Sequence, residues 1–144
     1  MDLRFLLNNM KVLALDLSTK TGYAVFNNGE LIESSVVRVE VKDFNVNNYP
    51  EKHPSYPKNI VAAADDMSSE VLKLYQRIRP DKIVIENTVR GRNRHTQRIL
   101  EFIHKSVLDH FISWGLDFTY LDPSQWRFLI DMRLSNEDKK NNIL

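Results

Sequence analysis

The feature that most constrains the fold is a lone aspartate, Asp16, inside an apolar stretch near the start of the chain. Apolar residues precede it, and a short polar segment ending in Gly22 separates it from a second apolar run. This order predicts a buried strand over residues 11–17, a tight turn, and a returning strand over residues 22–26. Burying an unpaired carboxylate in a strand is costly. Asp16 is therefore either a cap of the turn or a functional ligand.

The composition limits which metal ions the protein could bind and where in the cell it is expected. A chain of 144 residues with 42% hydrophobic and 27% charged residues is typical of one globular domain with a core of its own. Neither a bilayer-spanning apolar run nor a signal-peptide pattern occurs, which predicts an intracellular protein with no membrane partner. The absence of cysteine excludes thiolate metal sites, so a bound metal would be a hard cation such as Mg2+ or Mn2+.

The following segments predict an α/β domain. Asn27–Gly29 predicts a hairpin turn, and alternating valines and charged residues predict a half-exposed edge strand over residues 30–41. Prolines indicate a loop over residues 43–58. Apolar residues at helical spacing then predict a helix over residues 57–79. Because this helix lies between two predicted strands in the sequence, we expect residues 83–86 to form a strand parallel to the first one.

The C-terminal half continues this alternation. The sequence predicts a helix over residues 93–113 and a strand over residues 118–121, followed by a short helix with Asp122 at its cap. We expect residues 1–10 to be a loosely ordered lead-in and residues 11–144 to be a single domain. Three histidines on the second helix have no shared spacing and are expected to be ordinary helix residues: His95, His104 and His110.

A second carboxylate, Glu86, ends the strand that should lie beside the first one. The carboxyl ends of neighbouring parallel strands form the crevice where open α/β sheets bind ligands. Two carboxylates at that place would either repel each other or share a divalent cation. The sequence therefore predicts a metal site formed by Asp16 and Glu86.

Basic residues are expected to bring DNA to this site. The most basic segment of the chain follows Glu86 and contains Arg90, Arg92, Arg94 and Arg98 with no acidic residue among them. Guanidinium groups beside a flexible glycine suit contacts with phosphate oxygens. Lys20, in the turn after Asp16, could reach a phosphate as well, although an exposed turn lysine is equally expected there.

These residues resemble the RuvC-like Holliday junction resolvases of the RNase H-like superfamily, especially their shorter viral forms. The resemblance covers about residues 11–135 and rests on three segments: Leu13–Val25, Ile83–Asn87 and Thr119–Pro123. It implies an RNase H-like fold in which helices flank a mixed five-stranded sheet, an antiparallel hairpin meander with added parallel strands. It also implies divalent-metal-dependent cleavage of branched DNA by a homodimer, with Asp16 and Glu86 as the matching catalytic carboxylates.

One departure from the family concerns the C-terminal region. The family supplies its remaining catalytic carboxylates, or a histidine and an aspartate, from a C-terminal helix, whereas this sequence ends at Leu144. Asp131 and Asp138 do not fit the family pattern and are expected to be surface carboxylates. We therefore expect a chain truncated at that helix, which folds and binds DNA but lacks full catalytic strength.

The implied chemistry is phosphodiester hydrolysis, with Asp16 bridging two Mg2+ ions and Glu86 holding one of them. Three alternatives remain open. One is another RNase H-like nuclease, acting on RNA–DNA hybrids or replication forks. Another is a nucleic-acid-binding module without catalysis. The third is a phosphate-binding domain like those of sugar kinases and actin-like ATPases, although those proteins close two such domains around ATP.

Overall fold

Three consecutive antiparallel strands form the first half of a sheet: β1 (Lys11–Asp16), β2 (Lys20–Asn27) and β3 (Glu30–Arg38). The computed structural model describes residues 9–41, 56–87 and 93–127. Between β2 and β3, Asn28 and Gly29 both adopt positive φ, 52° and 85°, as a two-residue hairpin turn requires. The hairpin that the sequence predicted is therefore confirmed.

The observed ends of two strands differ from the prediction. The second strand begins at Lys20 rather than at residue 22, and the third ends at Arg38 rather than continuing to Val41. Arg38 pairs with Lys20, the first residue of β2, so the ladder has no further β2 residue to pair with beyond that point. Alternation alone predicted the strand, but only the partner's length fixes where it ends.

The second half of the sheet is built by crossover connections. Helix α2 (Lys58–Ile78) leads from β3 to β4 (Lys82–Glu86), and α3 (Arg94–Ser113) leads from β4 to β5 (Phe118–Leu121). Strand β4 is parallel to β1, as predicted, and β5 is parallel to β4. The strand order is β3-β2-β1-β4-β5, which makes β1 and β4 central neighbours. The predicted mixed five-stranded sheet with flanking helices is therefore confirmed.

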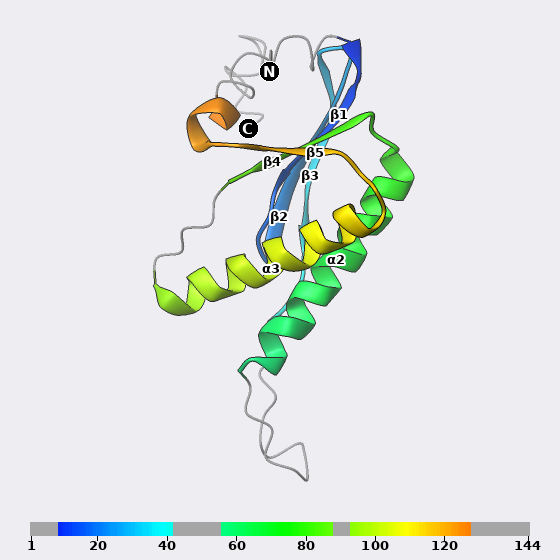
Figure 1. Cartoon of the computed structure of the whole chain (residues 1–144). Coiled ribbons are helices and arrows are strands. Elements are labelled where there is room, and N and C mark those ends of the chain that lie inside the picture. Colours follow the sequence, from blue (N-terminus) through cyan, green and yellow to red (C-terminus); the bar gives the residue numbers. More distant parts are fainter. Residues whose placement is uncertain (1–8, 42–55, 88–92, 128–144) are drawn as a thin grey trace.

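The two helices pack side by side on one face of the sheet (Figure 1). Their apolar faces bury the side chains of Leu13, Leu15, Ile83 and Ile85 in the larger core. Because strand side chains alternate between faces, the intervening residues of β1 and β4 project to the other face. A smaller core on that opposite face is formed by Val12, Ala14, Ala24, Phe26, Val84 and Leu121, with Met10, Leu31 and Trp126 packed against it.

Polar contacts tie the helices to the sheet and to each other. Arg77 of α2 forms a bidentate ion pair with Glu33 of β3, and the Tyr23 hydroxyl donates to the same carboxylate at 2.5 Å. Between the helices, the hydroxyls of Ser68 and Ser106 are 2.6 Å apart. Among the described residues, no helix is long and apolar enough to cross a membrane.

Candidate metal and nucleic-acid site

The two predicted carboxylates lie side by side at the centre of the sheet. Leu15 of β1 pairs with Ile85 of the parallel strand β4, and Asp16 and Glu86 are the next residues of these strands. Leu15 and Ile85 are buried beneath the helices, so alternation directs both carboxylates to the opposite face. The fold thus brings Asp16 and Glu86 together at the carboxyl ends of two central strands.

The charges of this pair interact. The pKa of Glu86 is raised to about 7, mainly by partial burial and also by the negative charge of Asp16, while Arg127 opposes the shift. A carboxylate pair of this kind offers hard oxygen ligands and excess negative charge, which suit a divalent cation. Mg2+ commonly uses only one or two protein carboxylates, with water and substrate phosphate completing its coordination. The described residues fit such an ion.

The described residues do not offer a larger protein ligand set. Within residues 9–41, 56–87 and 93–127, no group of three or more histidine, aspartate or glutamate side chains could hold a metal ion. Asp131 and Asp138, the local acids that the sequence offered as substitutes, lie outside the described residues. Asp122 caps the helical turn that begins at Pro123, because its Oδ1 accepts hydrogen bonds from the Gln125 backbone amide and the Ser124 hydroxyl. Its predicted capping role is confirmed.

The turn after Asp16 is closed by hydroxyl side chains. The Thr21 hydroxyl donates to the Ser18 carbonyl at 2.9 Å, and the Ser18 hydroxyl accepts from the Lys20 amide at 2.9 Å. Ser18 and Thr21 therefore supply the hydrogen bonds that the turn needs. The side chain of Lys20 is exposed, two residues before Gly22, which pairs with Asp16.

Sequence reasoning missed a basic residue near Lys20. Arg38, the last residue of β3, pairs with Lys20 across the β2–β3 ladder, and both side chains are exposed. Alternation places both on the Asp16 face, because Gly22 pairs with Asp16 on one side and with Val36 on the other. The strand register was the only signal that could have found Arg38, and it depends on an irregularity in the ladder between Val25 and Phe26.

Only part of the predicted arginine cluster lies within the described residues. Arg90 and Arg92 lie outside the described residues. Arg94 and Arg98 lie in the first turns of α3, where the helix is capped by the Asn93 side chain. The guanidinium of Arg98 stacks over the Tyr56 ring, 5.1 Å from its centroid, so this arginine already has an aromatic partner.

All three histidines lie in α3, as predicted, and His104 is the buried one among them. Its side chain is only 4% exposed, and its Nδ1 lies 2.8 Å from the Tyr120 hydroxyl of β5. Burial lowers the pKa of His104, while the Leu17 backbone and the charge of Asp16 oppose this shift. The Nε2 of His104 has no hydrogen-bond partner among the described residues. His104 thus braces α3 against β5, the neighbour of the strand that ends in Glu86.

Removing the Tyr120 hydroxyl should destabilise the protein, because the buried His104 ring would lose its hydrogen bond. In Tyr120→Phe, Nδ1 of His104 loses its partner, and we expect the free energy of unfolding to fall by about 1–2 kcal/mol. Urea unfolding followed by circular dichroism measures this loss. Tyr75→Phe is the matched control, since Tyr75 is half-buried against the larger core and the described residues offer its hydroxyl no hydrogen bond. Equal stability of the two variants would contradict the bracing role.

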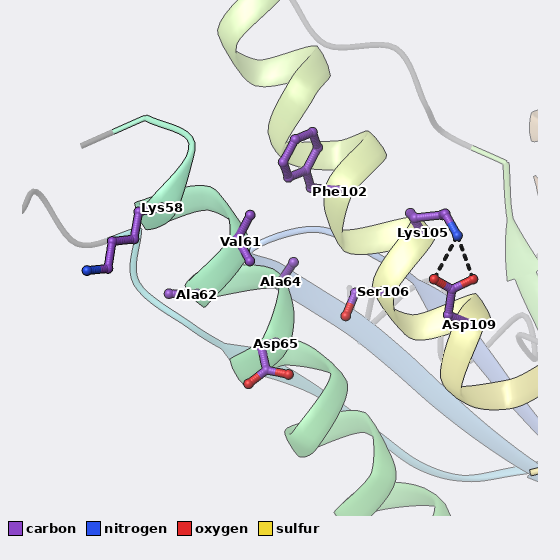
Figure 2. Close-up of a pocket in the computed structure, with 9 residues that line it drawn as sticks. All are labelled: Lys58, Val61, Ala62, Ala64, Asp65, Phe102, Lys105, Ser106 and Asp109. Carbon is purple, nitrogen blue, oxygen red and sulfur yellow. Dashed lines mark hydrogen bonds and ion pairs between the residues drawn. The ribbon is translucent and has the colours of Figure 1, made fainter. Parts of the chain in front are cut away.

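Cavities occur on both faces of the molecule. One lies between α2 and α3, away from the carboxylates, and Figure 2 shows it lined by Val61 and Ala64 of α2 and by Phe102 of α3, beside the Lys105–Asp109 ion pair. Another lies between the end of β3 and α2, where Arg38 and Lys73 are among its lining residues. A third has a volume of about 400 Å³ and is lined by Asp16 itself, so it adjoins the candidate metal site.

Solved structures show which fold this arrangement represents. RuvC of Thermus thermophilus in complex with a Holliday junction substrate matches 81% of this chain with a TM-score of 0.57 at 18% sequence identity. Another structure of Thermus thermophilus RuvC matches 79% with a TM-score of 0.53 at 19% identity. The yeast mitochondrial Holliday junction resolvase matches 85% with a TM-score of 0.54 at 15% identity. The chain therefore has the RNase H-like fold of RuvC-type proteins.

The similarity has clear bounds. The chain spans 66%, 64% and 57% of the lengths of these three structures. No family model matches the sequence, and no curated protein matches it. At such low identity the comparison establishes the fold, and the activity has to be argued from the site.

Proposed function

We propose that this chain is a structure-selective endonuclease that cleaves four-way or otherwise branched DNA by metal-dependent phosphodiester hydrolysis. The observation that carries the proposal is the position of Asp16 and Glu86, together on one face at the carboxyl ends of β1 and β4. The RNase H-like fold supports it, since neighbours with this fold include resolvases.

Asp16 and Glu86 would hold the metal ions. Two Mg2+ or Mn2+ ions bound there would supply a hydroxide nucleophile and stabilise the leaving 3′ oxygen. The protein's own contribution is to fix the carboxylate oxygens on two central strands, so that the scissile phosphate meets a rigid site. His104, braced by Tyr120, supports that rigidity from the helical face.

DNA binding is assigned to basic side chains near this face. Lys20 would contact a phosphate next to the scissile one. Arg90, Arg92, Arg94 and Arg98 would contact the more distant backbone, with Arg98 contributing least because it stacks on Tyr56.

The assembly and the type of resolvase are further parts of the proposal. The helix α3 would form a homodimer through its broad apolar stripe, close to the cavity drawn in Figure 2. A dimer suits a four-way junction because two related strands have to be cut. Residues 11–144 would form a single nuclease domain, similar to the shorter viral resolvases.

A substrate panel tests the proposed activity. The protein is incubated with labelled four-way junction, flap, RNA–DNA hybrid and linear duplex in Mg2+ or Mn2+, and the products are resolved on denaturing gels. We expect the junction to be cut fastest and EDTA to stop the reaction. Faster cleavage of the hybrid would instead indicate a different RNase H-like nuclease.

A second candidate, a junction-binding module without cleavage, is favoured by one observation. The described residues provide two acidic ligands and no third one. Tight binding of the junction without cleavage in Mn2+ would select this candidate.

A further inference from the structure

The face of the sheet beside Asp16 is built from small side chains. Gly22 lies directly opposite Asp16 in the ladder, and a Cβ atom added to Gly22 would meet no atom within 4 Å. In the neighbouring row, Ala24 pairs with Ser34. Gly22 does not need positive φ, so space rather than backbone conformation distinguishes this position. The sheet thus leaves an open volume next to the candidate metal site.

This volume is the cavity of about 400 Å³ that includes Asp16 in its lining. Trp126, half-buried against the smaller core, lines it together with Gly22 and Val36. Its size falls within the range of small-molecule pockets, roughly 300–1,000 Å³. An indole beside an apolar floor offers a flat surface on which a planar ring can stack.

Two basic residues follow in the next row of the same sheet face, and one of them, Arg38, also lines a separate cavity beside α2. Lys20 and Arg38 pair across β2 and β3, one row beyond Gly22 and Val36 and on the same face. Like charges in directly opposed positions destabilise a sheet. Neither side chain forms an ion pair with an acid among the described residues. A phosphate group would offset this repulsion by accepting hydrogen bonds from both side chains.

We propose that this cavity receives one nucleobase of the bound DNA strand, stacked on Trp126, while Lys20 and Arg38 hold the phosphate beside it. The proposal rests on the proposed function, because it places the strand with its scissile phosphate at Asp16. The apolar cavity suits the base, the basic pair Lys20 and Arg38 suits the phosphate, and Asp16 beside the cavity would hold the metal ion of the proposed function. A base can enter only when it is unpaired, which links the cavity to branched DNA.

Trp126 fluorescence provides the first test. The chain has two tryptophans, so Trp114→Phe leaves Trp126 as the single reporter. A synthetic four-way junction is titrated into this variant in EDTA, which prevents cleavage. We expect stacking to quench Trp126. Gly22→Leu in the same background should fill the cavity, remove the quenching and weaken binding about tenfold, with an unchanged thermal unfolding midpoint.

The basic pair, Lys20 and Arg38, provides an independent test. Arg38→Ala should reduce the slope of log affinity against log salt concentration by about one, the value expected for one lost phosphate contact. The matched control is Lys105→Ala, because Lys105 is an exposed lysine of α3 that lines neither the cavity beside Asp16 nor the one beside Arg38. This control should leave the slope unchanged.

The outcomes separate the inference from the proposed function. Junction binding with normal affinity in Gly22→Leu and no quenching of Trp126 would overturn the base pocket but leave the nuclease proposal standing. A lower unfolding midpoint in Gly22→Leu with unaltered DNA binding would show that protein fills the cavity, and would also overturn it. Failure of the unaltered chain to bind any DNA would remove both proposals.

Discussion

Asp16→Asn is expected to abolish metal-dependent cleavage of a four-way junction while leaving junction binding intact. Asp16 would contact both metal ions, so its loss removes nucleophile activation and leaving-group stabilisation together. A loss of several kcal/mol in transition-state stabilisation corresponds to at least about a thousandfold in rate. Single-turnover cleavage in Mg2+ or Mn2+ measures the rate, and a gel-shift assay measures binding.

The matched control is Asp65→Asn, because Asp65 is an exposed aspartate of α2, away from the carboxylate pair. This variant should cleave at the normal rate. Cleavage retained in Asp16→Asn would contradict the proposed mechanism, since no other described acid lies beside Glu86 in a comparable position.

Glu86→Gln is expected to abolish cleavage and, at pH 8, to stabilise the protein. The folded-state pKa of Glu86, about 7, exceeds its ordinary value of 4.5, so the folded protein binds a proton that the unfolded chain releases between these pH values. The free energy of unfolding therefore decreases as the pH rises through this window. Glutamine removes that penalty. After allowance for solvent screening of a half-exposed group, the gain at pH 8 should be about 1 kcal/mol.

Urea unfolding in EDTA at pH 4.5 and pH 8 measures this effect. The advantage of Glu86→Gln should be small at pH 4.5 and reach its full size above pH 7. Glu40→Gln, which changes an exposed glutamate outside the site, should show no such dependence on pH. A destabilised Glu86→Gln variant at pH 8 would mean that the carboxylate is a structural partner rather than a strained functional group.

The sequence predicted the parts of the fold that depend on local patterns. Asn28 and Gly29 accept positive φ cheaply, so the hairpin could be placed before its strands were known. The order of strand, helix and strand then predicted the parallel pairing of β1 and β4, because such crossovers follow one topology. That pairing brought Asp16 and Glu86 together. Their role as metal ligands stays a prediction.

Features that depend on register or on packing between distant segments could not be predicted in this way. A one-residue change in register moves every side chain to the other face, so the position of Arg38 follows only from the observed ladder. The contact between His104 and Tyr120 depends on how α3 lies over β5, and no local pattern encodes that. The helical spacing of three histidines indicated nothing about which of them is buried.

The position of the carboxylates on the two innermost neighbouring strands also governs how the site responds to partial opening of the fold. The strand order places β3 and β5 at the margins, where fraying costs little free energy, and β2, β1 and β4 inside the sheet, where we expect amide hydrogens to exchange only when the sheet opens. Asp16 and Glu86 therefore belong to the most protected cooperative unit. Arg38, at the end of the marginal strand β3, belongs to a less protected one. A fluctuation that opens this margin thus leaves the two carboxylates in place.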